Sequence, residues 1–342
     1  MKLSDFDYSL PKSLIAQYPL KKRDKSRLLV INRKKKTIGH KNFNNIIDYL
    51  NAGDLLILNN TKVVLARLFG FRKNTGGKVE ILLQEQIINN RFKALINPLG
   101  KLKIGEEISI NNNGLSFRLL DFANRIIEFN KKDILAKLDK IGHVPLPQYI
   151  KRQDLRIDKI RYQTVYAEHE GSIAAPTAGL HFTKSLLNKI RDKGVNVAFV
   201  TLHVGYGTFA PIRDEDISNH KMHKEYLEIP YDTIKLIRQT KDSDGKVVAV
   251  GTTSCRALES NKGKILNRNT ISTIKGYVDL FIYPPFKFKI IDSLITNFHL
   301  PKSTLYLLVA TFTGLNTIKK AYSQAIENKY RFYSYGDSMI IL

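Results

Sequence analysis

The fold class is decided by the stretch Thr183-Lys-Ser-Leu-Leu-Asn-Lys-Ile-Arg-Asp-Lys-Gly-Val-Asn-Val-Ala-Phe-Val-Thr-Leu-His-Val204. Its first half predicts a helix that follows Thr183, a residue type that caps helix N-termini, and runs through Lys193. Gly194 then suits the position just past a helix end. The apolar run Val195 to Val204 predicts a largely buried strand. A helix followed at once by a buried strand is typical of an α/β fold.

The same alternation continues toward the C-terminus. Residues 231–241 are predicted to be helical, Lys246 to Val250 to form a strand, and a second helix to begin at about Ser254. Residues 303–312 and 316–329 predict two further helices. We therefore expect an α/β (mixed α+β) body.

A different pattern occupies the segment from Phe69 to Ile127. Short β-branched and aromatic runs, such as Val79 to Leu83, are separated by Gly and Asn turns. Five or six such strands at close spacing predict a small all-β barrel or sandwich. We assign residues 1–65 and 150–342 to the α/β body and residues 66–149 to an inserted β-barrel domain.

Charge gives the first indication of a partner. The chain of 342 residues has 55 Lys and Arg against 31 Asp and Glu, a net charge of +24. Such an excess is typical of nucleic-acid-binding proteins, although a lysine-rich composition without such a partner also fits. The densest basic clusters, 21–23 and 33–36, flank the strand-like run Leu28 to Ile31 and are expected on turns.

Three observations exclude other classes of protein. The single cysteine, Cys255, excludes an internal disulfide or a thiolate metal cage. The longest mostly apolar stretch, Leu305 to Leu315, is too short to cross a bilayer, and the N-terminus lacks the apolar run of a secretory signal. We expect a cytoplasmic protein with no membrane association.

Two loops rich in small residues are candidate binding segments. Gly171 to Thr183 lacks bulky side chains and leads into a helix N-terminus, so a ligand could approach its backbone at Thr177. Residues 203–211 follow a predicted buried strand, at the end where α/β sheets bind ligands. There Gly205 and Gly207 free the backbone around Tyr206, whose ring could stack on a base. A purely structural loop is the alternative for the first segment.

A third candidate is the strand-turn-helix Val250 to Ser254. Thr252, Thr253 and Ser254 stand at a predicted helix start, where amide groups and the helix dipole favour a carboxylate or phosphate. Simple capping of the helix by Thr253 or Ser254 is the alternative. No Walker lysine follows, which excludes a nucleoside-triphosphate loop.

The histidines favour acid–base chemistry over a metal. His220, His223 and Glu225 lie close in sequence, but no His-Glu-x-x-His motif accompanies them, and we predict no metal. Histidine titrates near neutrality, which suits proton transfer. Near the C-terminus Arg331 lies among aromatic residues, a composition that suits single-stranded RNA and also a packed C-terminal edge.

Together these segments resemble the S-adenosylmethionine:tRNA ribosyltransferase-isomerase family of queuosine biosynthesis, almost from end to end. The sequence departs from the usual family residues at Asn60, Tyr206 and Pro285, where Asp, a small residue and Gly are usual. The resemblance is carried by Asp5–Pro11, Leu14–Gln17, Arg23–Arg27, Asn59–Val63, Ala66–Arg67, Gly77–Ile81, Tyr162–Tyr166, Ala174–Phe182, His203–Pro211, Met222–Glu225, Gly251–Ser260, Thr296–Thr304 and Tyr330–Asp337.

The resemblance implies a reaction. The ribosyl part of S-adenosylmethionine would be transferred to 7-aminomethyl-7-deazaguanine at the tRNA wobble position and isomerised, giving epoxyqueuosine-tRNA, adenine and methionine. It also implies an α/β body with an inserted barrel, S-adenosylmethionine as co-substrate, no metal, the tRNA anticodon loop as partner, and a monomer. A sulfonium acidifies the adjacent ribose 5′ carbon, so the chemistry needs a base, a proton donor for adenine and a dry cleft.

Roles for individual residues follow as hypotheses. We expect His181, His203, His223 and His299 to supply acid–base groups, with Glu225 orienting one of them. Thr252, Thr253 and Ser254 would hold the methionine carboxylate or a phosphate. The remaining candidates for binding substrate or RNA are Arg27, Lys62, Arg67, Thr177, Gly205, Tyr206, Gly207, Arg256, Lys302 and Arg331.

Two other functions stay open. An S-adenosylmethionine-dependent tRNA methyltransferase is disfavoured because no Gly-x-Gly loop follows a first strand. A noncatalytic tRNA-binding protein would explain the charge, but it would not explain the loops rich in hydroxyl groups and histidine.

Overall fold

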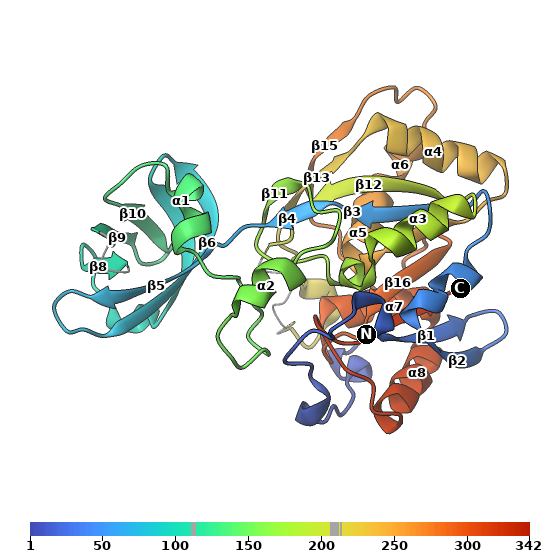
Figure 1. Cartoon of the computed structure of the whole chain (residues 1–342), viewed down its shortest axis with the longest axis horizontal. Helices are drawn as coiled ribbons and strands as arrows, with labels where there is room; N and C mark the ends of the chain where they lie inside the picture. The colour runs from blue at the N-terminus through green and yellow to red at the C-terminus, as the bar shows by residue number, and fades with distance from the viewer. Residues whose placement is uncertain (111–113, 206–211, 213) are drawn as a thin grey trace. The chain divides into compact units, whose positions relative to one another are not determined.

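Two compact units make up the chain in the computed structural model, which describes residues 1–110, 114–205, 212 and 214–342. One unit comprises residues 1–62, 147–153 and 160–342, and the other comprises 63–146 and 154–159. The larger unit is an α/β body and the smaller one a β-barrel (Figure 1). The predicted fold class is therefore confirmed.

A mixed sheet forms the centre of the larger unit. Its middle strands run parallel to one another, while both edges carry antiparallel strands and one further antiparallel pair lies inside the sheet. Within the described residues the order of the nine strands is β15 (Ile274–Val278), β13 (Glu225–Ile229), β12 (Asn196–Leu202), β3 (Leu55–Asn59), β14 (Val247–Val250), β16 (Ser293–Asn297), β17 (Ser338–Ile341), β1 (Arg27–Asn32) and β2 (Thr37–Asn42).

Both faces of this sheet are buried. Successive residues of β3 alternate between two cores: Leu55 and Ile57 belong to one, and Leu56 and Leu58 to the other. A strand buried on both faces reads as a continuous apolar run rather than an alternating one. This explains why β1 and β14 appear in the sequence as unbroken apolar stretches.

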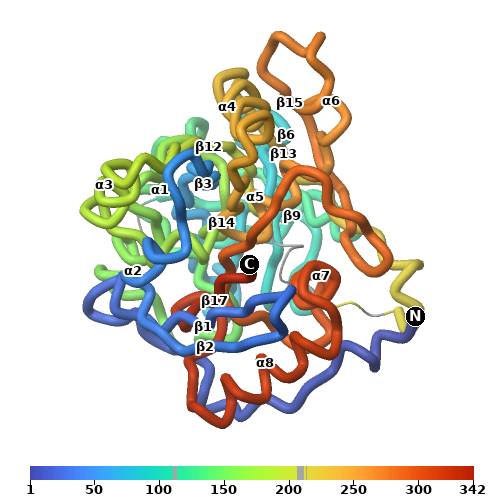
Figure 2. The backbone as a smooth tube through the Cα atoms, turned by 90° about the vertical axis from the view of Figure 1, so that its right-hand side faces the viewer, coloured from blue at the N-terminus to red at the C-terminus, as the bar shows by residue number. Residues whose placement is uncertain are grey.

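Helices cover the two faces of the sheet. One core includes residues of α4, α5, α7 and α8, and the other includes residues of α3. Figure 2 shows α7 and α8 beside β1, β2 and β17. No helix in the described ranges is long and apolar enough to span a bilayer. The helices are α3 (Lys184–Asp192), α4 (Tyr231–Asp242), α5 (Gly251–Ser260), α6 (Lys262–Leu266), α7 (Thr304–Thr313) and α8 (Leu315–Glu327).

Local sequence signals predicted the ends of α3 correctly, whereas they misplaced the start of α5. The Thr183 side chain accepts a hydrogen bond from the backbone N–H of Leu186 at 3.0 Å, and Gly194 has a φ of +86°, as predicted. The helix expected from about Ser254 instead begins at Gly251, and Val250 is its N-cap. Neither Thr253 nor Ser254 caps it, because Gly251 adopts a φ of +89° and turns the chain directly from strand into helix.

The smaller unit is a closed antiparallel barrel. One strand is much longer than its apolar run indicated, since β6 extends over 11 residues and bends at two register shifts. The barrel order is β10 (Ile126–Phe129), β7 (Arg91–Asn97), β6 (Lys78–Ile88), β5 (Arg67–Arg72), β8 (Glu107–Ile110) and β9 (Leu115–Asp121), and α1 (Ile134–Ile141) follows in the chain.

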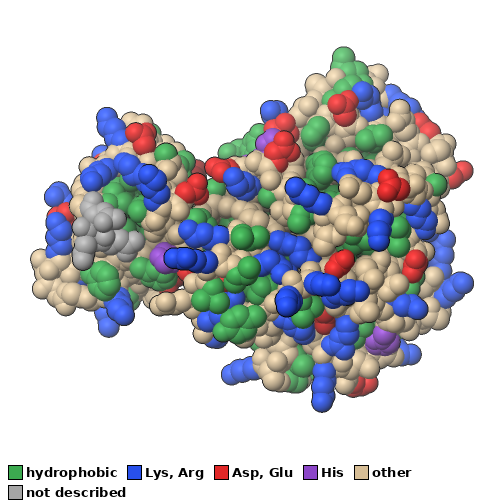
Figure 3. Space-filling model, viewed as in Figure 1, with side chains coloured by type: hydrophobic (Ala, Val, Ile, Leu, Met, Phe, Trp, Pro, Cys, Tyr) green, Lys and Arg blue, Asp and Glu red, His purple; other side chains and the backbone are tan. Residues whose placement is uncertain are grey.

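Short elements complete the fold, and basic side chains cover part of it. Lys and Arg gather on the face of the larger unit that includes the N-terminal segment (Figure 3). The short elements are η1 (Leu3–Phe6), η2 (Lys12–Leu14), η3 (Arg23–Lys25), η4 (Phe43–Tyr49), η5 (Leu99–Lys101), η6 (Thr177–His181), η8 (Ile217–Asn219), α2 (Arg156–Arg161), β4 (Thr61–Val63) and β11 (His169–Ser172).

Gly142 ends α1, and the atoms around it leave no room for a side chain. A Cβ at this position would lie 2.6 Å from the carbonyl oxygen of Leu138 and closer still to that of Leu65. Gly142→Ala is therefore expected to destabilise the protein by about 1–3 kcal/mol, as overpacking does. Gly100→Ala is the control, because a Cβ there meets nothing within 4 Å. Urea unfolding of both variants measures the difference, and equal midpoints would contradict the packing argument.

Candidate functional site

The candidate site lies where the central parallel strands of the larger unit end. We define the strand-end cavity as two adjoining pockets that share Thr177, His299 and Leu305, with volumes of about 350 and about 390 Å³. β14 ends at Val250 and β16 ends at Asn297, so the carboxyl ends of both strands lie at the cavity. Ligands of open α/β sheets bind at this end.

The N-terminus of α5 forms one wall of this cavity. Thr252 and Thr253 line it together with Gly251, and the N-cap residue, Val250, has no side-chain oxygen to satisfy the first amide groups. The Thr253 hydroxyl accepts a hydrogen bond from Asn59 Nδ2 at 3.2 Å. Amides without a side-chain cap at a helix start favour an anionic group. Ser254 is fully buried and donates to the Val250 carbonyl at 2.8 Å, so its hydroxyl serves the helix.

His299 contributes a neutral imidazole to the cavity. Its Nε2 lies 2.7 Å from the hydroxyl of Thr296. The backbone is fixed by two tyrosines, because its N–H donates to Tyr322 Oη at 2.9 Å and its carbonyl accepts from Tyr8 Oη. Burial lowers the pKa of His299 to about 3. The ring is therefore uncharged at neutral pH.

His181 is buried beside the cavity and has partners on both ring nitrogens. Asn297 Nδ2 donates to Nε2 at 3.2 Å, so Nδ1–H donates to Ser26 Oγ at 2.7 Å. Its ring also stacks on Phe43, with centroids 5.0 Å apart. Burial, as the largest cause, lowers its pKa to about 3. Both ring nitrogens of His181, one of the predicted acid–base residues, are therefore hydrogen-bonded within the protein.

His203 is half-buried just past the end of β12. Its Nδ1 lies 2.8 Å from Thr61 Oγ1, and its ring stacks on Tyr226 with centroids 5.6 Å apart. The ring also lies against Gly171, where a Cβ would be 2.7 Å from Nε2. Burial, and then the charge of His169, lower the pKa of His203. Oriented and partly exposed, this ring is available for proton transfer.

Glu225 and Arg256 form a buried ion pair. Arg256 Nη1 donates to Glu225 Oε2 at 2.5 Å, and the two side chains are only 2% and 3% exposed. Arg256 Nε also donates to the Leu280 carbonyl at 3.1 Å, and Glu225 Oε1 accepts from the Gly205 backbone N–H at 3.0 Å. The pair thus fixes the backbone of Gly205. Arg256, expected to contact RNA or substrate, has its guanidinium engaged in the interior.

Four of the other predicted basic residues pair with a carboxylate through their side chains, and Arg331 contacts one through its backbone. Lys62 pairs with Glu170 at 2.7 Å and Lys302 with Asp7 at 2.8 Å. Arg67 belongs to the barrel unit and pairs with Glu80 at 3.1 Å. Asp337 organises the remaining two, because it accepts from Arg27 Nε at 3.4 Å and from the Arg331 backbone N–H at 2.8 Å.

The structure thus brings part of the predicted set together. Thr177, Thr252, Thr253 and His299 share the strand-end cavity. His223 is exposed. Tyr206 and Gly207 lie outside the described residues, and Asn60, one of the unusual residues, donates to Glu168 at 3.1 Å.

Comparison with known proteins identifies the family. The profile described as "Queuosine biosynthesis protein" matches residues 3–341. The chain belongs to the queuosine biosynthesis protein family. It is 52% identical to the S-adenosylmethionine:tRNA ribosyltransferase-isomerase of Sulfurihydrogenibium sp. and 48% identical to that of Staphylococcus haemolyticus, over the whole of each chain.

A solved structure of the same kind is also similar. It is the crystal structure of S-adenosylmethionine tRNA ribosyltransferase from Thermotoga maritima, with 38% identity and a TM-score of 0.58 over 99% of this chain and all of that one. Among the described residues of this queuosine biosynthesis family member, no three His, Cys, Asp or Glu side chains gather as a metal site requires.

Sequence reasoning missed residues of this family member that hold the site residues in place through direct polar contacts. Asn59 holds Thr253, Asn297 holds His181, and Asp337 holds Arg27. Asn59 and Asn297 each end an apolar strand, and a polar residue at the carboxyl end of a buried strand was the signal that could have found them.

The buried histidines predict a loss of stability in acid. For His181 and His299 the folded-state pKa of about 3 lies below the unfolded value of about 6.5. Their contribution to the free energy of unfolding is complete above pH 6.5. Below that pH it declines by about 1.4 kcal/mol per pH unit for each histidine, because only the unfolded chain takes up the proton. Urea unfolding between pH 7.5 and 5.5 measures this slope. His181→Asn should reduce it and His40→Asn, at an exposed residue, should not; an unchanged slope in the first variant would refute the assignment.

Proposed function

We propose that this chain is an S-adenosylmethionine:tRNA ribosyltransferase-isomerase. It transfers and isomerises the ribosyl moiety of S-adenosylmethionine to 7-aminomethyl-7-deazaguanine at the tRNA wobble position, with epoxyqueuosine-tRNA, adenine and methionine as products. The observation that carries this proposal is the match of the family profile over residues 3–341, together with relatives of about 50% identity that bear this name over their full length.

The strand-end cavity is the proposed site for S-adenosylmethionine, used as co-substrate without a metal. The methionine carboxylate would bind at the start of α5, where amides lack a side-chain cap and Thr252 and Thr253 supply hydroxyls. Thr177 and His299 line the same space, so the sulfonium and ribose would lie near a neutral imidazole. A neutral ring suits a cationic ligand, since it adds no repulsion.

His203 is the proposed general base of the reaction. A base must remove a proton from the ribose 5′ carbon beside the sulfonium, and it must therefore be unprotonated and accessible. His203 is half-buried, oriented by Thr61, and has a lowered pKa. His299, which is buried and neutral, would supply a second imidazole inside the cavity. His181 would hold the Asn297 side chain in position through their hydrogen bond.

The tRNA anticodon loop is the proposed partner. The net charge of +24 suits a polyanion, and the anticodon loop is already single-stranded, so presenting its base costs little unstacking energy. Arg27, Lys62, Lys302 and Arg331 are candidates in the larger unit, and Arg67 in the barrel unit. We further propose that the protein is cytoplasmic and monomeric. Light scattering of the purified protein tests its oligomeric state.

One incubation separates the proposed function from its alternatives. Purified protein, S-adenosylmethionine labelled in the ribose, and tRNA carrying the deazaguanine precursor should yield label in the RNA, with free adenine and methionine. A methyltransferase would instead give S-adenosylhomocysteine that retains the label, and no label would enter the RNA. A noncatalytic binding protein would give complex formation and no product. Either of the last two results would refute the proposal.

A further inference from the structure

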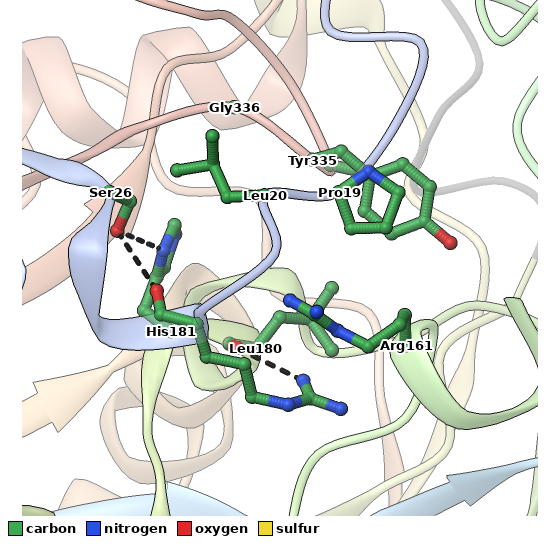
Figure 4. A pocket seen from close by; sticks show the side chains of 10 residues that line it. Pro19, Leu20, Ser26, Arg161, Leu180, His181, Tyr335 and Gly336 are labelled. Carbon is green, nitrogen blue, oxygen red and sulfur yellow. Dashed lines mark hydrogen bonds between the residues drawn. The ribbon is translucent and has the colours of Figure 1, made fainter. Parts of the chain in front are cut away.

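A second pocket of the larger unit has two arginines in its lining. We call it the arginine pocket; its lining includes Arg23, Arg161, Leu180, His181, Tyr335 and Gly336. In Figure 4 the Arg161 side chain points toward the middle of the pocket, with Leu180 and Pro19 on opposite sides. None of the residues proposed above to bind S-adenosylmethionine lines this pocket.

Neutral carbonyl groups hold both guanidinium groups in place. Arg23 donates to the Leu180 carbonyl at 3.0 Å and to the Ile160 carbonyl at 2.8 Å. Arg161 Nη1 donates to the Lys21 carbonyl at 3.0 Å, while its buried Nε has no hydrogen-bond partner. The two cations are therefore positioned by groups that leave their charges uncompensated, and one buried donor is unsatisfied.

No carboxylate neutralises this pair of charges. Some other buried or partly buried arginines have acidic partners, as Arg256 has Glu225 and Arg72 has Glu106. Arg238 instead donates to backbone carbonyl groups, and it lines neither the arginine pocket nor the strand-end cavity. In the described part of the chain neither Arg23 nor Arg161 forms an ion pair, and the pocket lining contains no Asp or Glu. Burial and the charge of Arg161 lower the pKa of Arg23 to about 10. Like charges in a partly dry pocket are unfavourable unless an anion joins them.

We propose that the arginine pocket binds a phosphodiester group of the RNA backbone. Guanidinium groups present paired donors that match the oxygens of a phosphate. Leu20, Pro19 and Tyr335 supply apolar and aromatic surface beside the cations, which suits the sugar or base of a bound nucleotide. This inference rests on the proposed function, because it takes the partner to be tRNA.

The position of the pocket favours a phosphate close to the modified nucleotide. Ser334 lines both the arginine pocket and the strand-end cavity. His181, which lines the arginine pocket, is hydrogen-bonded to Asn297, which lines the cavity. A strand with one phosphate in the arginine pocket would thus place a neighbouring nucleotide at the cavity that holds the sulfonium. The position of the bound phosphate would thereby determine which base of the strand lies at the cavity.

A double-mutant cycle tests this inference. Anticodon stem-loop RNAs, each with one loop phosphate replaced by a neutral methylphosphonate, are titrated against wild-type protein and Arg161→Met between 50 and 200 mM salt. Arg161→Met should weaken binding about tenfold and reduce the slope of log affinity against log salt by about 0.7–0.9. One methylphosphonate should produce the same loss in wild type and almost no further loss in the variant.

Matched variants define the outcomes. Arg191→Met removes an exposed arginine of α3, and the methylphosphonate should weaken RNA binding by this variant by the same factor as in wild type. If Arg161→Met fails to fold, Arg161→Lys, which retains the charge and loses the paired donors, is measured in the same cycle. Absence of coupling at every phosphate overturns the inference, as does a fall in S-adenosylmethionine affinity with RNA binding unchanged, which would identify the anion as the methionine carboxylate. Intact RNA coupling without product formation would instead refute the proposed function alone.

Discussion

Arg256→Met is expected to lower the free energy of unfolding by about 3–5 kcal/mol, the cost typical of breaking a buried ion pair. The substitution leaves the Glu225 carboxylate, 3% exposed, without its cation. It also leaves the Leu280 carbonyl without the donor it has in the wild type. Hydration cannot replace either partner in the interior, so the folded state bears the whole penalty. Urea unfolding monitored by circular dichroism measures the change.

Two further variants make this prediction specific. Lys235→Met removes one partner of the exposed pair between Lys235 and Asp232, and it should change stability by less than about 0.5 kcal/mol. The double variant Arg256→Met with Glu225→Leu should recover part of the loss, because no buried charge then remains. A loss below about 1 kcal/mol in Arg256→Met would show that the pair is hydrated and that the burial argument is wrong.

The sequence predicted elements whose determinants are local. The helix α3 has a capping Thr183, an amphipathic run and Gly194, and the structure places it within a residue of the predicted ends. The barrel followed from runs of β-branched residues between Gly and Asn turns. The start of α5 was misplaced because three hydroxyl residues imitate a cap, whereas the positive φ of Gly251 makes the turn. Backbone conformation at a glycine cannot be read from its neighbours alone.

Charge pairing depends on tertiary contacts that no local pattern encodes. Arg256 was expected to bind RNA or substrate because it is basic and follows a candidate loop, yet it pairs with a glutamate 31 positions away. Arg23 and Arg161 are far apart in sequence and converge on one pocket. The sequence could therefore supply the residue types of the site, while the folded chain decides which cations are compensated and which are available.

His203→Asn is expected to reduce kcat by about 10²–10⁴-fold, the range typical of losing a general base. Asn cannot take up the proton from the ribose 5′ carbon, although it can still hydrogen-bond to Thr61. Because the pKa of His203 is lowered below 6.5, wild-type activity should persist to slightly acidic pH and fall as the ring protonates. The variant should lose this acid limb. Rates of adenine and methionine release between pH 5 and 8 measure both effects.

Comparison with other histidines separates a catalytic role from a structural one. His40→Asn alters an exposed histidine whose Nδ1 lies 2.8 Å from Tyr330 Oη, and it should leave both kcat and the acid limb unchanged. Thr61→Val retains the His203 ring and removes its hydroxyl partner, so kcat should fall less and the acid limb should shift in pH rather than vanish. If His203→Asn retains turnover within threefold of wild type, the base is another group, and His299, which lines the strand-end cavity, becomes the residue to substitute.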